Sequence, residues 1–152
     1  MKIGDIVENF TLKDQNGNEF DLYKNLDKKI LLVFYPKDNS PVCSMQLSEY
    51  QLNIDEFDKN GIKVVGINTE SVDSHLTFCN HQQINFPLLS DVDKKVSRSF
   101  NALTFFGLNK RKIVLIDTDK KIKYTDSVAA FRYPDSGYIF EELKKLQILL
   151  WA

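Results

Sequence analysis

The chain has 152 residues, of which 43% are hydrophobic and 27% charged, and its 20 basic residues nearly cancel its 21 acidic ones. This length suits one domain, residues 1–152, and the balanced charge argues against nucleic acid or an anionic membrane as a partner. No stretch approaches the roughly 20 apolar residues of a membrane span, and the first residues lack the apolar segment of a secretory signal. We therefore expect a cytoplasmic protein, in which two cysteines indicate chemistry more than a structural disulfide.

The N-terminal half predicts a β-hairpin, a buried strand and a helix. Residues 9–22 place apolar positions on both sides of an Asn-Gly pair, which is typical of a hairpin turn. Residues 30–35 are an apolar run of the kind found in a central strand. A helix is expected over residues 42–59, followed by Gly61 at a left-handed cap. The apolar face of this helix consists of Leu47, Tyr50, Ile54 and Phe57.

The middle of the chain predicts a strand over residues 62–68 and then a helix with Ser71 at its N-cap. Residues 86–89 are a short extended segment. A further helix is expected to open at Ser90 with Asp93. The apolar stripes of the two helices are Val72, Leu76 and Cys79 in the first, and Val92, Val96 and Phe100 in the second.

The C-terminal part predicts two strands and a last helix. Residues 112–117 and 121–128 are the strands, joined by a turn at 118–120, and the helix is expected over 137–150. The order β-β-β-α-β-α-α-β-β-α is a βαβ half followed by a ββα half, which predicts one α/β domain folded as an αβα sandwich. The last helix would bury Ile139, Leu143, Leu146 and Leu150.

Cys43 stands where reactive chemistry is expected. The apolar run ends at Pro36, a polar turn follows, and Cys43 lies at the start of the next helix. A helix N-terminus presents unpaired N–H groups and about half a positive charge, which favour a thiolate over a thiol. The ring of Pro36 would exclude water and the hydroxyl of Ser40 would donate a hydrogen bond to the sulfur. The polar turn also argues against the deep burial of an inert cysteine.

The pattern Pro36-x-x-x-Ser40-x-x-Cys43 resembles the active-site motif of the peroxiredoxins, P-x-x-x-(T/S)-x-x-C. The resemblance covers nearly the whole chain. It implies a thioredoxin-like αβα sandwich with an N-terminal β-hairpin, and a peroxidase that needs no bound cofactor or metal. Segments 34–38 and 86–91 are typical of the Q-type group, also called bacterioferritin comigratory proteins.

Arg111, six residues before Asp117, matches the active-site arginine of that family. The resemblance implies that Arg111, Ser40 and the N–H groups of the first helical turn hold the peroxide against the Cys43 thiolate. Cys43 would then become a sulfenic acid. Because Arg111 lies in a run of three basic residues, a solvated surface charge is the alternative interpretation.

Three residues depart from the family pattern. Gln46 stands where a glutamate often holds the arginine, and it can still form a hydrogen bond but does not offset the charge. Ser48 stands where Q-type members often carry the cysteine that resolves the sulfenic acid. Ile113 replaces a threonine that usually lies beside the arginine. These departures bear on regeneration and local geometry rather than on the attacking sulfur.

Cys79 is then the internal candidate for the resolving cysteine, since some Q-type members place it in this helix. The alternative is a core cysteine, because Cys79 shares its stripe with apolar residues and free cysteines are often buried. A disulfide needs Cα atoms within about 7 Å, so we expect local unfolding to accompany its formation. A metal site of His75, Cys79 and His81 is disfavoured, because His81 points elsewhere and no fourth ligand is evident; both histidines are expected at the surface.

Two functions of different classes fit these residues. The first is a monomeric thiol peroxidase that reduces hydrogen peroxide and organic hydroperoxides and is regenerated by thioredoxin or a similar dithiol. The second is a peroxide sensor that passes the oxidation of Cys43 to a partner protein. A thioredoxin-like oxidoreductase is disfavoured because no C-x-x-C is present, and a cysteine hydrolase because no histidine follows in the expected layout.

Overall fold

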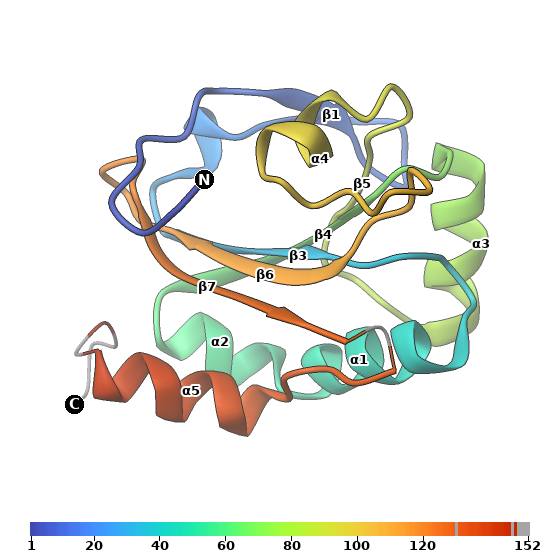
Figure 1. Ribbon diagram of the computed structural model, residues 1–152. Helices are drawn as coiled ribbons and strands as arrows, with labels where there is room; N and C mark the ends of the chain where they lie inside the picture. Colours follow the sequence, from blue (N-terminus) through green and yellow to red (C-terminus); the bar gives the residue numbers. More distant parts are fainter. Residues whose placement is uncertain (130, 147, 149–152) are drawn as a thin grey trace.

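Seven strands form one mixed sheet in the computed structural model, which describes residues 1–129, 131–146 and 148 (Figure 1). The spatial order is β2-β1-β5-β4-β3-β6-β7. The strands are β1 (Thr11–Lys13), β2 (Glu19–Asp21), β3 (Lys29–Phe34), β4 (Ile62–Asn68), β5 (Leu88–Ser90), β6 (Arg111–Ile116) and β7 (Ile122–Val128). The helices are the 3-10 helix η1 (Tyr23–Asn25), α1 (Pro41–Leu52), α2 (Ile54–Lys59), α3 (Val72–Gln82), α4 (Lys95–Ser99) and α5 (Ser136–Lys145).

The central strands β3 and β4 are parallel and buried on both faces, which explains their continuous apolar sequences. β5 runs parallel to β4, whereas β6 and β7 are antiparallel additions beside β3. Helices α1, α2 and α5 lie along one face of the sheet, and α4 lies over the other (Figure 1). Two separate apolar clusters fill the space on the two faces. The αβα sandwich and the N-terminal hairpin predicted from the sequence are therefore confirmed.

The helix predicted over residues 42–59 is two helices, and that prediction is wrong at Asn53. Asn53 ends α1 with φ −107° and ψ 18°, and α2 begins at the next residue. The Asn53 side-chain amide donates to the Glu49 carbonyl oxygen at 3.0 Å, a local bond of the kind that competes with helical continuation. The predicted apolar face still packs inward, and Gly61 has the expected left-handed φ of 70°.

Two predicted helical stripes also need correction. Ser71 caps α3 as expected, but Leu76 is 39% exposed, and the buried face consists of His75, Phe78 and Cys79. The helix expected to open at Ser90 begins only at Lys95, because Ser90 belongs to β5. Val92 is consequently exposed, while Val96 and Phe100 are buried as predicted. The buried Asp91 carboxylate accepts from the N–H groups of Val96 and Ser97 and so positions this short helix.

The last helix ends earlier than predicted. It covers Ser136–Lys145, with Asp135 as its N-cap, and it buries Ile139 and Leu143. Leu146 is 51% exposed, so its predicted burial is wrong, and Leu150 lies outside the described residues. Lys144 and Lys145 fill its last turn, where cations suit the helix dipole. None of the helices in the described ranges is long and apolar enough to cross a membrane.

Gly66 lets β4 pack closely against its neighbours, and this close approach can be tested. A Cβ added at Gly66 would lie 2.5 Å from Cδ2 of Leu88 and 3.3 Å from Cε1 of Tyr35, both of them buried. We expect Gly66→Ala to lower the free energy of unfolding by about 1–3 kcal/mol, as overpacked cores do. Gly137→Ala is the control, since its nearest neighbour is 3.5 Å away. Equal urea midpoints for the two variants would contradict this prediction.

Candidate active site

The first turn of α1 carries Cys43 as its third residue, after Ser40 at the N-cap and Pro41 at the first helical position. Proline suits that position because its missing N–H would have no helical acceptor. The preceding loop turns at Asn39, which has a φ of 62°. This sharp turn brings the chain from the end of β3 directly into α1 and points the Cys43 side chain into the core. The sulfur lies close to unpaired N–H groups at a helix N-terminus.

Cys43 is fully buried, with 0% of its surface exposed. The expectation that the polar turn would keep it from deep burial is therefore wrong. The reason is that α1 packs its first turn against the sheet, so that Cys43 belongs to the same apolar cluster as Val33 and Leu47. A reactant can reach the sulfur only when neighbouring side chains move.

Arg111 reaches this sulfur from a strand 68 residues further along the chain. Its Nη2 donates to Sγ of Cys43 at 3.3 Å, and its Nη1 donates to Oε1 of Gln46 at 2.6 Å. Alternation along β6 directs Arg111 to the α1 face, together with Ile113, and turns Lys112 to the other face. Arg111 is only 2% exposed, so its interpretation as a solvated surface charge is wrong. A buried guanidinium needs a negative or polar partner, and a Cys43 thiolate supplies one.

Gln46 orients the guanidinium through a chain of hydrogen bonds. Its Nε2 donates to the Tyr50 hydroxyl at 3.0 Å, and that hydroxyl donates to the Pro134 carbonyl oxygen at 2.6 Å. Burial raises the pKa of Tyr50 well above its usual value, so the hydroxyl keeps its proton. Because that proton is committed to the carbonyl, the Tyr50 oxygen accepts from the Gln46 amide. The amide oxygen of Gln46 is thereby turned towards Arg111.

Ser40 makes a different contact from the one predicted, and Pro36 lies at the start of the same loop. The Ser40 hydroxyl donates to the Lys37 carbonyl oxygen at 3.4 Å, rather than to the sulfur as predicted. This bond is long, so it holds the hydroxyl only weakly. Pro36 is partly buried directly after Tyr35, and the exclusion of water from the sulfur by its ring stays a prediction.

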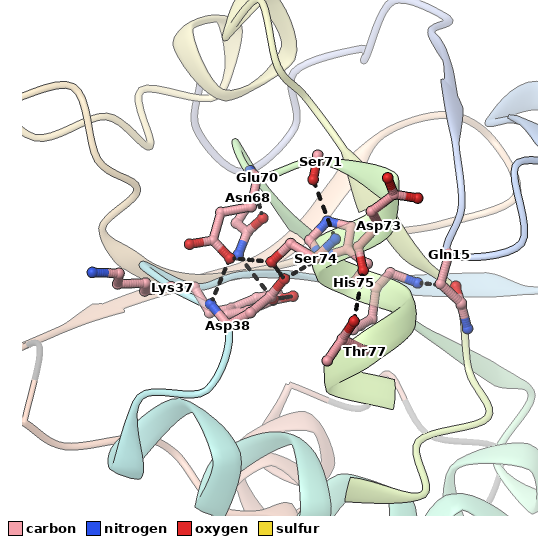
Figure 2. A network of polar contacts seen from close by, with 12 residues as sticks. Gln15, Lys37, Asp38, Asn68, Glu70, Ser71, Asp73, Ser74, His75 and Thr77 are labelled. Atoms are coloured by element: carbon pink, nitrogen blue, oxygen red, sulfur yellow. Dashed lines mark hydrogen bonds and ion pairs between the residues drawn. The ribbon is translucent and has the colours of Figure 1, made fainter. Parts of the chain in front are cut away.

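A buried network of hydrogen bonds surrounds Asp38, a residue of the loop between β3 and α1 (Figure 2). This network was not predicted from the sequence. The carboxylate accepts hydrogen bonds from the side chains of Tyr35 at 2.6 Å, Asn68 at 3.2 Å, Ser74 at 2.7 Å and His75 at 2.7 Å. The signal that could have found it is the helical period, which places His75 on the same buried face as Cys79. The surface position expected for His75 is wrong, because its side chain is 0% exposed.

The pKa values of the two carboxyl groups in this network, Asp38 and Glu70, depend on their neighbours. Burial by itself raises the pKa of Asp38, but the hydrogen bond and charge of His75, with bonds from Tyr35 and Ser74, hold that pKa below its ordinary value. Burial and the neighbouring Asp38 raise the pKa of Glu70. The Ser74 hydroxyl lies within hydrogen-bond distance of both carboxylates, at 2.7 Å and 2.9 Å, and has one proton to donate. Asp38 therefore holds its negative charge more readily than Glu70 does.

Cys79 lies on the buried face of α3, with 4% of its surface exposed, and belongs to the same apolar cluster as Cys43. Neither cysteine is in a disulfide. Burial, with the charges of Asp38 and Asp14, raises the pKa of Cys79 to about 12. Helices α1 and α3 are neighbours, since Ser48 donates to the Gln82 side chain at 3.1 Å. Within the described part of the chain, no three His, Cys, Asp or Glu side chains are placed to hold a metal ion.

Comparisons with known proteins agree with this geometry. Residues 3–125 match the AhpC/TSA family. The chain is 35% identical over 132 residues to peroxiredoxin Bcp of Escherichia coli, covering 82% of this chain and 84% of that protein. It is 32% identical over 148 residues to the chloroplastic peroxiredoxin Q of Triticum aestivum, covering 96% of this chain and 67% of that one. The crystal structure of peroxidoxin BcpB from Mycobacterium tuberculosis superposes with a TM-score of 0.83 at 28% identity, covering 97% of each chain.

The contact between Arg111 and Cys43 predicts how fast the sulfur reacts. We expect Arg111→Met to slow the reaction of Cys43 with hydrogen peroxide by roughly two to four orders of magnitude, as expected for the loss of a preorganised charged donor. Arg111→Lys should restore only part of the rate, because an ammonium cannot hold Sγ and Gln46 together as the guanidinium fork does.

The measurement is stopped-flow mixing with hydrogen peroxide in a Cys79→Ser background, where Cys43 is the remaining cysteine. Lys110→Met is the matched control, because it removes the neighbouring charge from a side chain that is not at the sulfur. The same loss of rate in both variants would mean that the contact is not responsible.

Proposed function

The chain belongs to the AhpC/TSA family and is a thiol peroxidase of the peroxiredoxin type, and we propose that Cys43 is the residue that attacks the peroxide. The observation that carries this proposal is the 3.3 Å contact between the Arg111 guanidinium and the buried sulfur. A thiolate is the nucleophilic form of cysteine, and this contact together with the helix N-terminus favours it.

The reaction follows from this arrangement. The Cys43 thiolate attacks one peroxide oxygen, the S–O bond forms as the O–O bond breaks, and the electron pair leaves on the second oxygen. Negative charge thus moves from sulfur to the leaving oxygen. The Arg111 guanidinium and the N–H groups of the first α1 turn are fixed donors that stabilise this charge as it develops. The leaving oxygen takes a proton from water, and Cys43 is left as a sulfenic acid.

Ser40 and Pro36 have supporting roles in this proposal. The Ser40 hydroxyl is held by a single long bond, so it can rotate to contact the bound peroxide. Pro36 shields the loop side of the sulfur from water. The substrates would be hydrogen peroxide and small organic hydroperoxides, since the sulfur is buried and leaves little room. The family resemblance supports a cytoplasmic monomer reduced by thioredoxin or a similar dithiol, and the balanced charge argues against nucleic acid or an anionic membrane as a partner.

Cys79 is proposed as the resolving cysteine. It lies on the neighbouring helix, in the same apolar cluster as Cys43. A thiol with a pKa of about 12 is almost entirely protonated at neutral pH and is a poor nucleophile. Attack on the sulfenic acid therefore requires that α3 unfolds locally over residues 72–82, which exposes Cys79 to water and returns its pKa towards the ordinary value. The products would be the Cys43–Cys79 disulfide and water.

Replacement of the attacking sulfur tests the first step. We expect Cys43→Ser to fold normally and to lose peroxide reduction by at least about a thousandfold, because a serine hydroxyl is not ionised at neutral pH. The measurement is peroxide consumption with thioredoxin in excess, and circular dichroism checks the fold. Cys79→Ser serves as the matched control, and it should keep one equivalent of rapid peroxide consumption. Activity of Cys43→Ser within tenfold of wild type would mean that another nucleophile is used.

Replacement of Cys79 tests the second step. In the wild type, one equivalent of peroxide should produce an intramolecular disulfide, visible by mass spectrometry and as a monomeric band on a non-reducing gel. Cys79→Ser should lose thioredoxin-driven turnover and be oxidised readily to the sulfinic acid, because the sulfenic acid has no internal thiol to condense with. Full thioredoxin-dependent turnover of Cys79→Ser would make Cys79 a core residue and the protein a one-cysteine peroxidase resolved by an external thiol.

A further inference from the structure

We propose that Asp38 and His75 form a latch that holds the loop before Cys43 against α3, and that this latch sets how readily the two cysteines meet. The two residues are positioning residues, since neither contacts the reacting sulfur in the structure. The proposal rests on the assignment of Cys79 as the resolving cysteine.

The contacts of Asp38 join three separate parts of the chain (Figure 2). Oδ1 accepts from the hydroxyl of Tyr35, the residue that follows β3, and from the side-chain amide of Asn68, the last residue of β4. Oδ2 accepts from Ser74 and His75, both in the first half of α3. The Asp38 N–H donates to Glu70 at 3.0 Å, so the backbone of the loop is held as well. The loop therefore cannot leave its place without breaking contacts to α3.

His75 supplies the charge that balances this carboxylate. Its Nδ1 lies 2.7 Å from Oδ2 of Asp38, and its Nε2 lies 3.0 Å from the Leu89 carbonyl oxygen. Both ring nitrogens thus face acceptors, and only an imidazolium donates to both at once. The resulting pair is buried, with side-chain exposures of 0% and 1%. Removal of one member of a buried ion pair is strongly destabilising, because the other charge is left without a partner.

Each residue of the latch lies a few residues before one of the two cysteines along the chain. Asp38 precedes Cys43 by five residues, on the loop that leads into α1, and His75 precedes Cys79 by one helical turn. A disulfide requires that both segments rearrange. A closed latch therefore keeps the peroxidatic site assembled and delays the attack of Cys79 on the sulfenic acid. During this delay a second peroxide can oxidise the sulfenic acid to sulfinic acid. The strength of the latch thus determines how the sulfenic acid is divided between the two products.

The test uses Asp38→Asn, which keeps the shape of the side chain but removes its charge. After one equivalent of peroxide, we expect sulfenic acid to form at a rate within about threefold of wild type, while disulfide forms about tenfold faster, as expected for weakening a charge-assisted contact. More peroxide should then be needed to produce sulfinic acid. Rapid-quench mass spectrometry measures both steps separately.

Hydrogen exchange tests the coupling between the two segments. Asp38→Asn, a change in the loop, should speed amide exchange in residues 72–82 as well as in 41–48. His75→Asn, a change in α3, should speed exchange in the same two segments. Ser71→Ala is the matched control, because it removes the α3 N-cap without touching Asp38, and it should speed exchange in α3 alone. Should Asp38→Asn not fold, Ser74→Ala removes one bond to the carboxylate and should give a smaller change in the same direction.

The failure of this proposal differs from the failure of the proposed function. An unchanged rate of disulfide formation in Asp38→Asn, with faster exchange only in its own loop, would overturn the latch and leave Cys79 as the resolving cysteine. The same result for Ser74→Ala overturns it if Asp38→Asn cannot be made. Full turnover of Cys79→Ser would instead remove the disulfide step on which the latch acts, and the assignment of Asp38 and His75 to resolution would fall with it.

Discussion

The buried contact between Arg111 and Cys43 is the interaction on which the rest of the site depends. A guanidinium that is 2% exposed is costly unless it is well paired, and two of its partners here are the Cys43 sulfur and the neutral Gln46 amide. The arginine therefore gains most when the sulfur is negative. The thiolate is the form of the sulfur that pairs best with the arginine, and it is also the form that reacts. Stability and reactivity therefore favour the same ionisation state of Cys43.

The sheet makes this contact possible. β3 delivers the loop that leads to Cys43, and β6 pairs antiparallel with β3, with Phe34 opposite Lys112. The start of β6 therefore lies beside the end of β3, although the sequence separates them widely. Alternation along β6 then decides which of three consecutive basic side chains enters the site. Arg111 faces α1, and Lys112 faces the opposite layer, where its Nζ donates to the Phe100 carbonyl oxygen.

Much of this could be predicted from the sequence, and the parts that could not have physical reasons. The central strands, the hairpins and the P-x-x-x-S-x-x-C pattern are local, so periodicity and spacing identify them. The break at Asn53 depends on a side-chain hydrogen bond that no apolar pattern reports. The late start of α4 depends on which carboxylate accepts from the N–H groups of its first turn. Ser90 is part of β5, and the carboxylate that accepts is that of Asp91. The helical period places His75 on the buried face of α3, but its partner Asp38 lies 37 residues away, so no local pattern indicates the contact between them.

Two buried polar networks thus serve opposite requirements. The Arg111–Gln46–Tyr50 chain ends at a backbone carbonyl and has neutral members beyond the arginine, which makes it a fixed support. The network of Asp38 ends instead in an ion pair to a helix that has to move if Cys79 is to react. Burial and the charge of Asp38 raise the pKa of Tyr35 well above its ordinary value, so its hydroxyl remains a donor to Asp38 in the closed arrangement. A peroxidase with an internal resolving thiol needs both features, because the attacking sulfur must be held firmly for the first step and released for the second.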